Sequence, residues 1–406
     1  MTEKVTVLLG AGASVEAGLP GSRQLTQEVA ERYRVAQNPQ TLRTLNAVAG
    51  AMIAFDASRG GSAFEALDVE RLFSAVEMLA DRESVELTPF VASWQPGIEG
   101  TTKRGLPSFF GRNVQKAVFD TTFGTQAIER LFSEGVRALS GGSPDNAFAD
   151  LRDNLVLVLR EVLLVDPSKT NYLLPLVQHA ASDNFLIATL NYDLALETAA
   201  KSVGLTVDTG ISTWPGGLDW EWTQGGETSM RLLKLHGSID WVYEQSASSR
   251  VRGVQRERAI EQLDLTDERS LYSRRPPGLI FGQRGRLRSE GPFLAMLLEF
   301  ARALESTDRI IIVGYSLRDT HINSVIRTWY TRKPGRRVTL VDPGLPMPDV
   351  LHTWDREKHP GFMIDLIEEM YEKPDWSTPQ VTHVLKPGHQ VERCGAGIAL
   401  QALFAD

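Results

Sequence analysis

Five short runs of apolar, mostly β-branched residues set the strongest limit on what this chain can fold into. They span Val5–Leu9, 185–190, 231–235, Arg309–Val313 and Arg337–Val341. Each run is bounded by glycine, a polar turn or the start of a helical pattern, which suits strands covered on both faces. Helical patterns over 14–33, 194–203 and 320–330 follow three of the runs. This alternation predicts an α/β fold: a Rossmann-like, mostly parallel sheet with helices on both faces.

The stretch between the first two runs has a different pattern. Segments 63–81, 125–139 and 147–164 place apolar residues at helical spacing, without a strand pattern. We therefore expect a largely helical insertion in the sheet domain. The predicted organisation is residues 1–35 for the first part of a Rossmann domain, 36–179 for the insertion, 180–345 for the rest of the Rossmann domain, and 346–406 for a C-terminal extension. The extension has a helical pattern at 362–372 and a final apolar segment at 397–404.

Composition excludes several classes of protein. In the 406 residues, 42% are hydrophobic and 23% are charged, which excludes a wholly disordered or fibrous chain. The net charge of −8 argues against a surface built throughout for nucleic acid. No apolar run reaches the ~18 residues that a membrane span needs, and no basic segment precedes the first apolar run as in a signal peptide. We expect a protein with no membrane contact.

One segment has a net positive charge, unlike the chain as a whole. Residues 250–288 hold ten arginines against five acidic residues. Such a patch could contact a nucleic-acid backbone or an acidic partner, and the alternative is a solvated loop with a short helix.

Cysteine use is the most informative part of the composition. Cys394 is the single cysteine, so the chain can form no internal disulfide, as is usual in a reducing cytoplasm. It also cannot build a zinc site that needs two cysteine ligands, and the seven histidines show no HExxH spacing. The sequence predicts a cytoplasmic protein without a bound metal.

A glycine-rich turn follows the first predicted strand. Residues 10–14 read Gly-Ala-Gly-Ala-Ser and open a predicted helix, and Gly18-Leu19-Pro20 comes shortly after. Glycines there let the backbone approach a pyrophosphate, and a tight turn for packing alone is the alternative. The spacing is not G-x-G-x-x-G, and no acidic residue ends an evident second strand about 20 positions on. This counts against a hydride-transfer enzyme.

Polar side chains follow the other strands at the edge where an open α/β sheet binds ligands. Asn191 and Asp193 come after the second strand, and either one could merely cap the next helix. His236 follows the third strand and suits general-base work, with a structural histidine as the alternative. Gly314 and Ser316 follow the fourth strand, and Asp342 follows the fifth. For each of these two motifs the alternative is an ordinary loop residue at the end of a strand.

Together, GAGAS…GLP, TLNYD, KLHGSIDW, VGYSL and VDP resemble, in this order, the sirtuin-like domain, specifically its zinc-less bacterial branch. The resemblance implies a phosphate loop and its arginine, a nicotinamide and ribose pair, a catalytic histidine, and an adenosine side. The corresponding residues are Gly10, Ala11, Gly12, Ser14, Pro20 and Arg23; Asn191 and Asp193; His236; and Gly314, Ser316, Leu317 and Asp342.

Two departures bear on the activity that this resemblance implies. Sirtuin deacylases carry a four-cysteine zinc ribbon, which one cysteine cannot supply, and Gly21-Ser22 replaces the Asp-Phe before the loop arginine. Zinc-less bacterial relatives resemble NAD+ hydrolases of anti-phage defence. We therefore expect hydrolysis of NAD+ to ADP-ribose and nicotinamide by a homo-oligomer with a sensing partner, such as a HerA-type ring ATPase. The alternatives are an ADP-ribosyltransferase or protein deacylase using the same site, and a non-catalytic sensor or scaffold that binds NAD+ or ADP-ribose.

Overall fold

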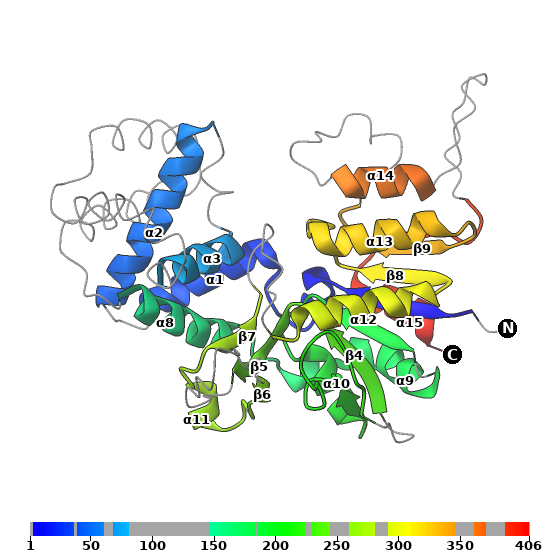
Figure 1. The fold of residues 1–406 in the computed structure, drawn as a ribbon, viewed down its shortest axis with the longest axis horizontal. Coiled ribbons are helices and arrows are strands. Elements are labelled where there is room, and N and C mark those ends of the chain that lie inside the picture. The colour runs from blue at the N-terminus through cyan, green and yellow to red at the C-terminus, as the bar shows by residue number, and fades with distance from the viewer. Residues whose placement is uncertain are drawn as a thin grey trace. The chain divides into compact units, whose positions relative to one another are not determined.

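The computed structural model of the chain describes residues 3–35, 39–60, 68–80, 147–183, 185–223, 229–243, 260–280, 291–345, 361–370 and 386–405 (Figure 1). The chain divides into two compact units. The sheet unit comprises Met1–Gly21, Leu163–Asp264 and Pro277–Asp406, and the helical unit comprises Ser22–Val162 and Leu265–Pro276.

Seven strands in the described part of the sheet unit form a parallel sheet in the order β10-β9-β8-β1-β2-β4-β3. They are β1 (Val5–Leu9), β2 (Leu186–Thr189), β3 (Thr206–Asp208), β4 (Ser229–Lys234), β8 (Arg309–Val313), β9 (Arg337–Val341) and β10 (Gln390–Glu392). All five predicted runs are strands of this sheet. The Rossmann-like α/β fold expected from the sequence is therefore confirmed.

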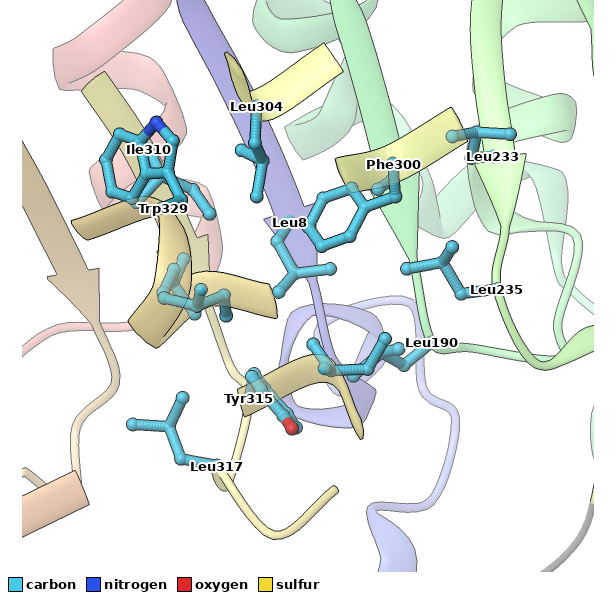
Figure 2. Packing of buried hydrophobic residues seen from close by; sticks show 14 of the residues in the cluster. Leu8, Leu190, Leu233, Leu235, Phe300, Leu304, Ile310, Tyr315, Leu317 and Trp329 are labelled. Atoms are coloured by element: carbon cyan, nitrogen blue, oxygen red, sulfur yellow. The ribbon is translucent and has the colours of Figure 1, made fainter. Parts of the chain in front are cut away.

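Alternate residues of the central strand β1 pack on opposite faces of the sheet, as a strand requires. Leu8 lies in a core with α12 (Phe293–Glu305), α13 (Thr320–Arg332) and α14 (Gly361–Met370). Figure 2 shows Leu8 with Phe300 and Leu304 of α12 in this core.

The opposite face forms a second core. Val7 and Leu9 pack there with α9 (Leu174–Asp183), α10 (Ala195–Ser202) and α15 (Ala396–Phe404). Both cores contain fully buried strand residues, so the sheet is covered by helices on both faces.

The chain runs outward from β1 in both directions of the sheet. β2 and β4 lie on one side of it, and β8 and β9 lie on the other. The gap in strand order between β1 and β8 is a topological switch point, where open α/β sheets bind their ligands. The loops that leave β1, β2, β4 and β8 all start at this carboxyl edge.

A second sheet of the described sheet unit was not foreseen from the sequence. β5 (Gly237–Tyr243) pairs antiparallel with β6 (Ile260–Gln262) and with β7 (Pro277–Leu279). β5 begins directly after His236, so this sheet fixes the exit of the chain from β4.

The helical unit is formed by α1 (Ser22–Val35), α2 (Pro39–Ser58), α3 (Val69–Ala80), α8 (Ala147–Val162) and the short α11 (Glu268–Leu271). Arg160 of α8 is fully buried and donates hydrogen bonds to the carbonyl oxygens of Leu271 and Ser273. The helices predicted within 63–81 and 147–164 are present, and the one predicted at 125–139 lies outside the described residues. No helix of the described ranges is long and apolar enough to cross a membrane.

The helix predicted at 14–33, directly after the first strand, is wrong in its start. Residues Ala11–Ser14 form a single 3-10 turn, η1, and α1 begins only at Ser22 and belongs to the helical unit. Gly18 adopts a left-handed φ of 79°, which ends the turn, and Pro20 has no N–H to continue it.

Candidate functional site

The loop after β1 is built around close approach to the loop after β8. Gly10 N–H donates to the carbonyl of Val313 at 2.9 Å, and Gly12 N–H donates to the carbonyl of Gly314 at 2.8 Å. A Cβ added at Gly10 would lie 2.6 Å from the carbonyl oxygen of Gly314. The glycines therefore serve the packing of two loops, the alternative that the sequence left open. A phosphate role for Gly10, Ala11, Gly12 and Ser14 stays a prediction.

Asn191 joins the loop after β2 to the loop after β1. Its Nδ2 donates to the carbonyl oxygen of Gly10 at 2.9 Å and to Oγ of Ser14 at 2.8 Å. Asn191 is only 9% exposed, and its Oδ1 is buried without a hydrogen-bond partner among the described residues. A buried amide oxygen without a partner costs about 1–3 kcal/mol, so this atom is suited to accept a hydrogen bond from a ligand.

Asp193 accepts a hydrogen bond from the first residue of α10, whose N-cap is Leu194. Its Oδ1 accepts a hydrogen bond from the backbone N–H of Ala195 at 2.9 Å, and Asp193 is 8% exposed. This oxygen therefore has a structural role at the start of α10. Its predicted contact with the carboxamide of nicotinamide stays a prediction.

A small cavity lies beside Asn191 and Asp193. Its volume is about 10 Å³, roughly the space that one water molecule needs. Polar walls come from three elements and apolar residues close the rest: Ser14, Thr189, Asn191, Asp193 and Glu197, with Leu9, Ala13, Leu173, Ala195 and Leu196. Among the described residues, this cavity therefore has room for about one water molecule next to Asn191.

Two buried groups outside the predicted set support these loops. The hydroxyl of Tyr172 donates to the carbonyl oxygen of Ala13 at 2.6 Å. Burial raises the pKa of Tyr172, and the charges of Asp193 and Glu16 raise it further, so the hydroxyl keeps its proton. Sequence reasoning missed this residue because nothing in the segment around it marks a contact to a loop 159 positions away.

Lys234 is the second supporting group. It has no exposed side-chain surface, and its Nζ donates to the carbonyl oxygen of Asp193 and to Oε1 of Glu197. Burial raises the pKa of Glu197, and the ammonium of Lys234 opposes that rise. The sequence signal that could have pointed to this pair is a lysine at the end of an apolar strand, although the sequence does not show which residue is its partner.

His236 pairs with a residue that the prediction omitted. Its Nε2 lies 2.9 Å from Oδ2 of Asp319, and both side chains are mostly buried, at 16% and 19% exposed. The His236 ring also lies 6.3 Å from the ring of Tyr192, the neighbour of Asn191. The predicted histidine and asparagine therefore lie at the same edge of the sheet.

Asp319 is an ionised carboxylate in this arrangement. Burial alone would raise its pKa, but the hydrogen bond and charge of His236 and the backbone N–H groups of Ile322 and His321 hold the pKa below its usual range. The one sequence signal that could have pointed to Asp319 is its position directly before the helical pattern at 320–330, which is typical of an N-cap.

The predicted adenosine-side residues differ in their surroundings. Gly314 has φ 61° and packs on Gly12, Ser316 is exposed, and Leu317 is buried with φ 55°. Oδ1 of Asp342 accepts a hydrogen bond from the N–H of Gly344 at 2.7 Å, within a turn after β9. Their predicted contacts with adenosine stay predictions.

The remaining predicted residues are Pro20, Arg23 and those of the arginine patch. Pro20 is half-buried between η1 and α1, and Arg23 lies in the first turn of α1, in the helical unit. Most of the arginine patch at 250–288 falls outside the described residues; Arg269 lies on α11, and Arg274 and Arg275 follow it. Across the described parts of the chain, no group of three or more histidine, cysteine or acidic side chains is placed to hold a metal.

Comparison with known proteins finds a similarity in one part of the chain. Residues 186–359 match the family model of the SIR2-like domain. The match contains Asn191, Asp193, His236 and the loop after β8, and it confirms the resemblance to sirtuin-like domains. This part of the chain is therefore similar to the SIR2-like domain, and the similarity indicates NAD-dependent activity at the level of the superfamily. No curated protein matches the chain.

Proposed function

We propose, from the SIR2-like domain at residues 186–359, that this chain hydrolyses the nicotinamide–ribose bond of NAD+ to give ADP-ribose and nicotinamide. The observation that carries the proposal is the buried Oδ1 of Asn191, which has no partner in the described structure. It lies at the switch-point edge, where His236 also lies. A buried acceptor without a partner, at the same sheet edge as a candidate base, fits a site that handles a hydroxyl or a water.

The reaction requires an oriented nucleophile and a base that accepts its proton. Cleavage of an N-glycosidic bond develops oxocarbenium-like charge at the ribose carbon, which must be met by an oriented nucleophile. Asn191 Oδ1 would orient a ribose hydroxyl or the attacking water by accepting its hydrogen bond. His236 would take the proton that the water loses as its oxygen bonds to the ribose carbon and nicotinamide leaves. General-base help of this kind contributes about 10²–10⁴-fold in rate.

Water is the acceptor that the composition favours. One cysteine cannot form the four-cysteine zinc ribbon that sirtuin deacylases carry beside their acyl-lysine groove. An ADP-ribosyltransferase would use the same residues with a protein or nucleic-acid acceptor in place of water. These activities differ in products, so product analysis separates them.

Hydrolysis of NAD+ needs restraint, because a free hydrolase would drain its own cell. We propose that the chain acts as an effector of anti-phage defence, as a homo-oligomer controlled by a sensing partner such as a HerA-type ring ATPase. The arginine patch at 250–288 and the C-terminal extension are the segments we propose for that contact. Co-purification with the products of neighbouring genes tests this part.

The test of the activity is an incubation of the purified chain with NAD+, alone and with its co-purifying partner, followed by chromatography of nicotinamide and ADP-ribose. We expect equal amounts of both products. His236→Ala and Asn191→Ala should each abolish release while the circular-dichroism spectrum stays unchanged. Asn154→Ala is the matched control, because Asn154 lies on α8 and donates to the carbonyl of Asp150 in its own helix.

Other outcomes would replace the proposal. Labelled acceptor protein would identify a transferase, and deacylated peptide would identify a deacylase. Binding of NAD+ without any nicotinamide release, with the partner present, would identify a sensor or scaffold.

A further inference from the structure

We propose that Asp319 is a positioning residue that holds His236 with its proton on Nε2 and presents the lone pair of Nδ1 to the reacting water. The inference rests on the proposed hydrolysis for its catalytic consequence, but the arrangement of the ring itself can be tested without activity. It assigns a role to a residue outside the predicted site and names the ring nitrogen that acts.

The two oxygens of Asp319 have separate tasks. Oδ1 accepts hydrogen bonds from the backbone N–H groups of His321 at 2.8 Å and Ile322 at 3.1 Å, which caps α13. Oδ2 lies 2.9 Å from Nε2 of His236. Helix capping is complete with Oδ1, so the contact of Oδ2 with the ring is not a requirement of the cap.

The carboxylate is held in place from the other side as well. The hydroxyl of Tyr315 accepts the N–H of Asp319 at 3.1 Å and donates to Oδ1 of Asn323 at 3.0 Å. Nδ2 of Asn323 donates to the carbonyl of Leu317 at 2.7 Å, where the backbone has its left-handed turn. Asp319 is thus fixed by its loop and by the helix that it caps, which leaves Oδ2 little freedom to move.

The tautomer follows from donor and acceptor counting. An ionised carboxylate can only accept, so a neutral His236 that bonds to Asp319 must carry its proton on Nε2. Nδ1 is then an acceptor, and in the described structure no hydrogen bond is made to it. The base of the proposed reaction is therefore Nδ1, and the imidazolium formed when it takes a proton is stabilised by the carboxylate behind the ring.

Asp319→Asn separates positioning from capping. Asparagine is an equally good N-cap. Its Oδ1 must accept the N–H groups of the helix, so its Nδ2, which can only donate, faces His236. The ring must then accept at Nε2 and carry its proton on Nδ1, which removes the lone pair from the reacting side. We expect kcat to fall about 10²–10⁴-fold with little change in KM.

The direct readout is ¹⁵N nuclear magnetic resonance of histidine-labelled protein, with His236→Gln used to assign the signal. We expect the Nε2–H tautomer in the wild type and the Nδ1–H tautomer in Asp319→Asn. Asp267→Asn is the control, because Asp267 caps α11 through a carboxylate oxygen on the N–H of Ser270. It should change neither the tautomer nor kcat.

The outcomes separate this inference from the proposed function. A wild-type proton on Nδ1, or an Asp319→Asn variant with the wild-type tautomer and kcat, would reduce Asp319 to a helix cap. A tautomer switch in a protein that releases no nicotinamide would uphold the positioning and overturn the hydrolase. A switch that leaves kcat unchanged in an active protein would overturn the assignment of Nδ1 as the base.

Discussion

Nζ of Lys234 lies 2.7 Å from Oε1 of Glu197 and 2.6 Å from the carbonyl oxygen of Asp193, with the lysine side chain fully buried. The pair joins β4 to the first turn of α10 and to the loop that carries Asn191. Buried charges of this kind are costly to expose singly, because desolvation of each ion is offset only by the other.

We therefore expect Lys234→Met to lower the free energy of unfolding by about 3–5 kcal/mol, since it leaves the Glu197 carboxylate buried and unpaired. The double variant Lys234→Met/Glu197→Gln should recover part of that loss, because no charge is then stranded. Urea denaturation measures both. A single variant within 1 kcal/mol of wild type, or a double variant as unstable as the single, would contradict an ion pair of this kind.

The lowered pKa of Asp319 predicts a dependence of stability on pH. A carboxyl group with a folded pKa below its unfolded value of about 3.9 adds stability above that value and loses it as pH falls through the folded pKa. The deficit of Asp319→Asn in the free energy of unfolding should thus be largest near neutral pH and shrink below about pH 4.

Denaturant unfolding from pH 3 to pH 7 measures this deficit. His236→Gln removes the ring nitrogen that lies 2.9 Å from Oδ2 of Asp319 and should flatten the same pH dependence. A deficit that stays constant over the whole range would show that the charge of Asp319 contributes nothing to stability.

The contact between the loops after β1 and β8 predicts the effect of a single methyl group. A Cβ at Gly314 would lie 2.3 Å from the N of Ala13 and 2.4 Å from the carbonyl carbon of Gly12. Gly335 has a similar left-handed backbone, with φ 88°, but nothing lies within 4 Å of its added Cβ. Gly335→Ala should therefore lower the free energy of unfolding by about 1–2 kcal/mol, through the strained backbone alone.

Gly314→Ala should lower the free energy of unfolding by ~1–3 kcal/mol more than Gly335→Ala, because the backbone of the loop after β1 must move. Chemical denaturation of the two variants gives the difference. If both variants lose the same free energy of unfolding, the two loops can separate at no cost. The glycines would then not be needed for packing of the loops.

Local pattern was enough to predict the main strands, because each of them is an apolar run long enough to be recognised. β3 and β10 escaped prediction since they read Thr-Val-Asp and Gln-Val-Glu, with one apolar residue each. Nothing in such three-residue segments reports the neighbour with which they pair. The antiparallel β5–β7 sheet escaped for the same reason, since its pairing depends on segments distant in sequence.

The candidate site was predicted only as far as strand ends define it. Asn191 and His236 could be placed at one edge from topology, but the contact of Asn191 with Ser14 spans 177 positions. Asp319 directly precedes a helical pattern, which is typical of a helix cap, but a cap accounts for only one of its two carboxylate oxygens. The partner of its second oxygen exists only once β4 and β8 lie in the same sheet.

The place of β1 in the middle of the sheet also sets the order in which the chain can assemble. Val5 pairs with Arg309, and Thr6 with Leu186, so β1 has no neighbour until those residues have been made. At ~5–20 residues per second, the ~300 residues up to β8 take roughly 15–60 s to synthesise. During that time the apolar strand lacks at least one of its two partners and is a natural target for chaperones. A fragment limited to the matched range would lack this strand and expose the edges of both β2 and β8.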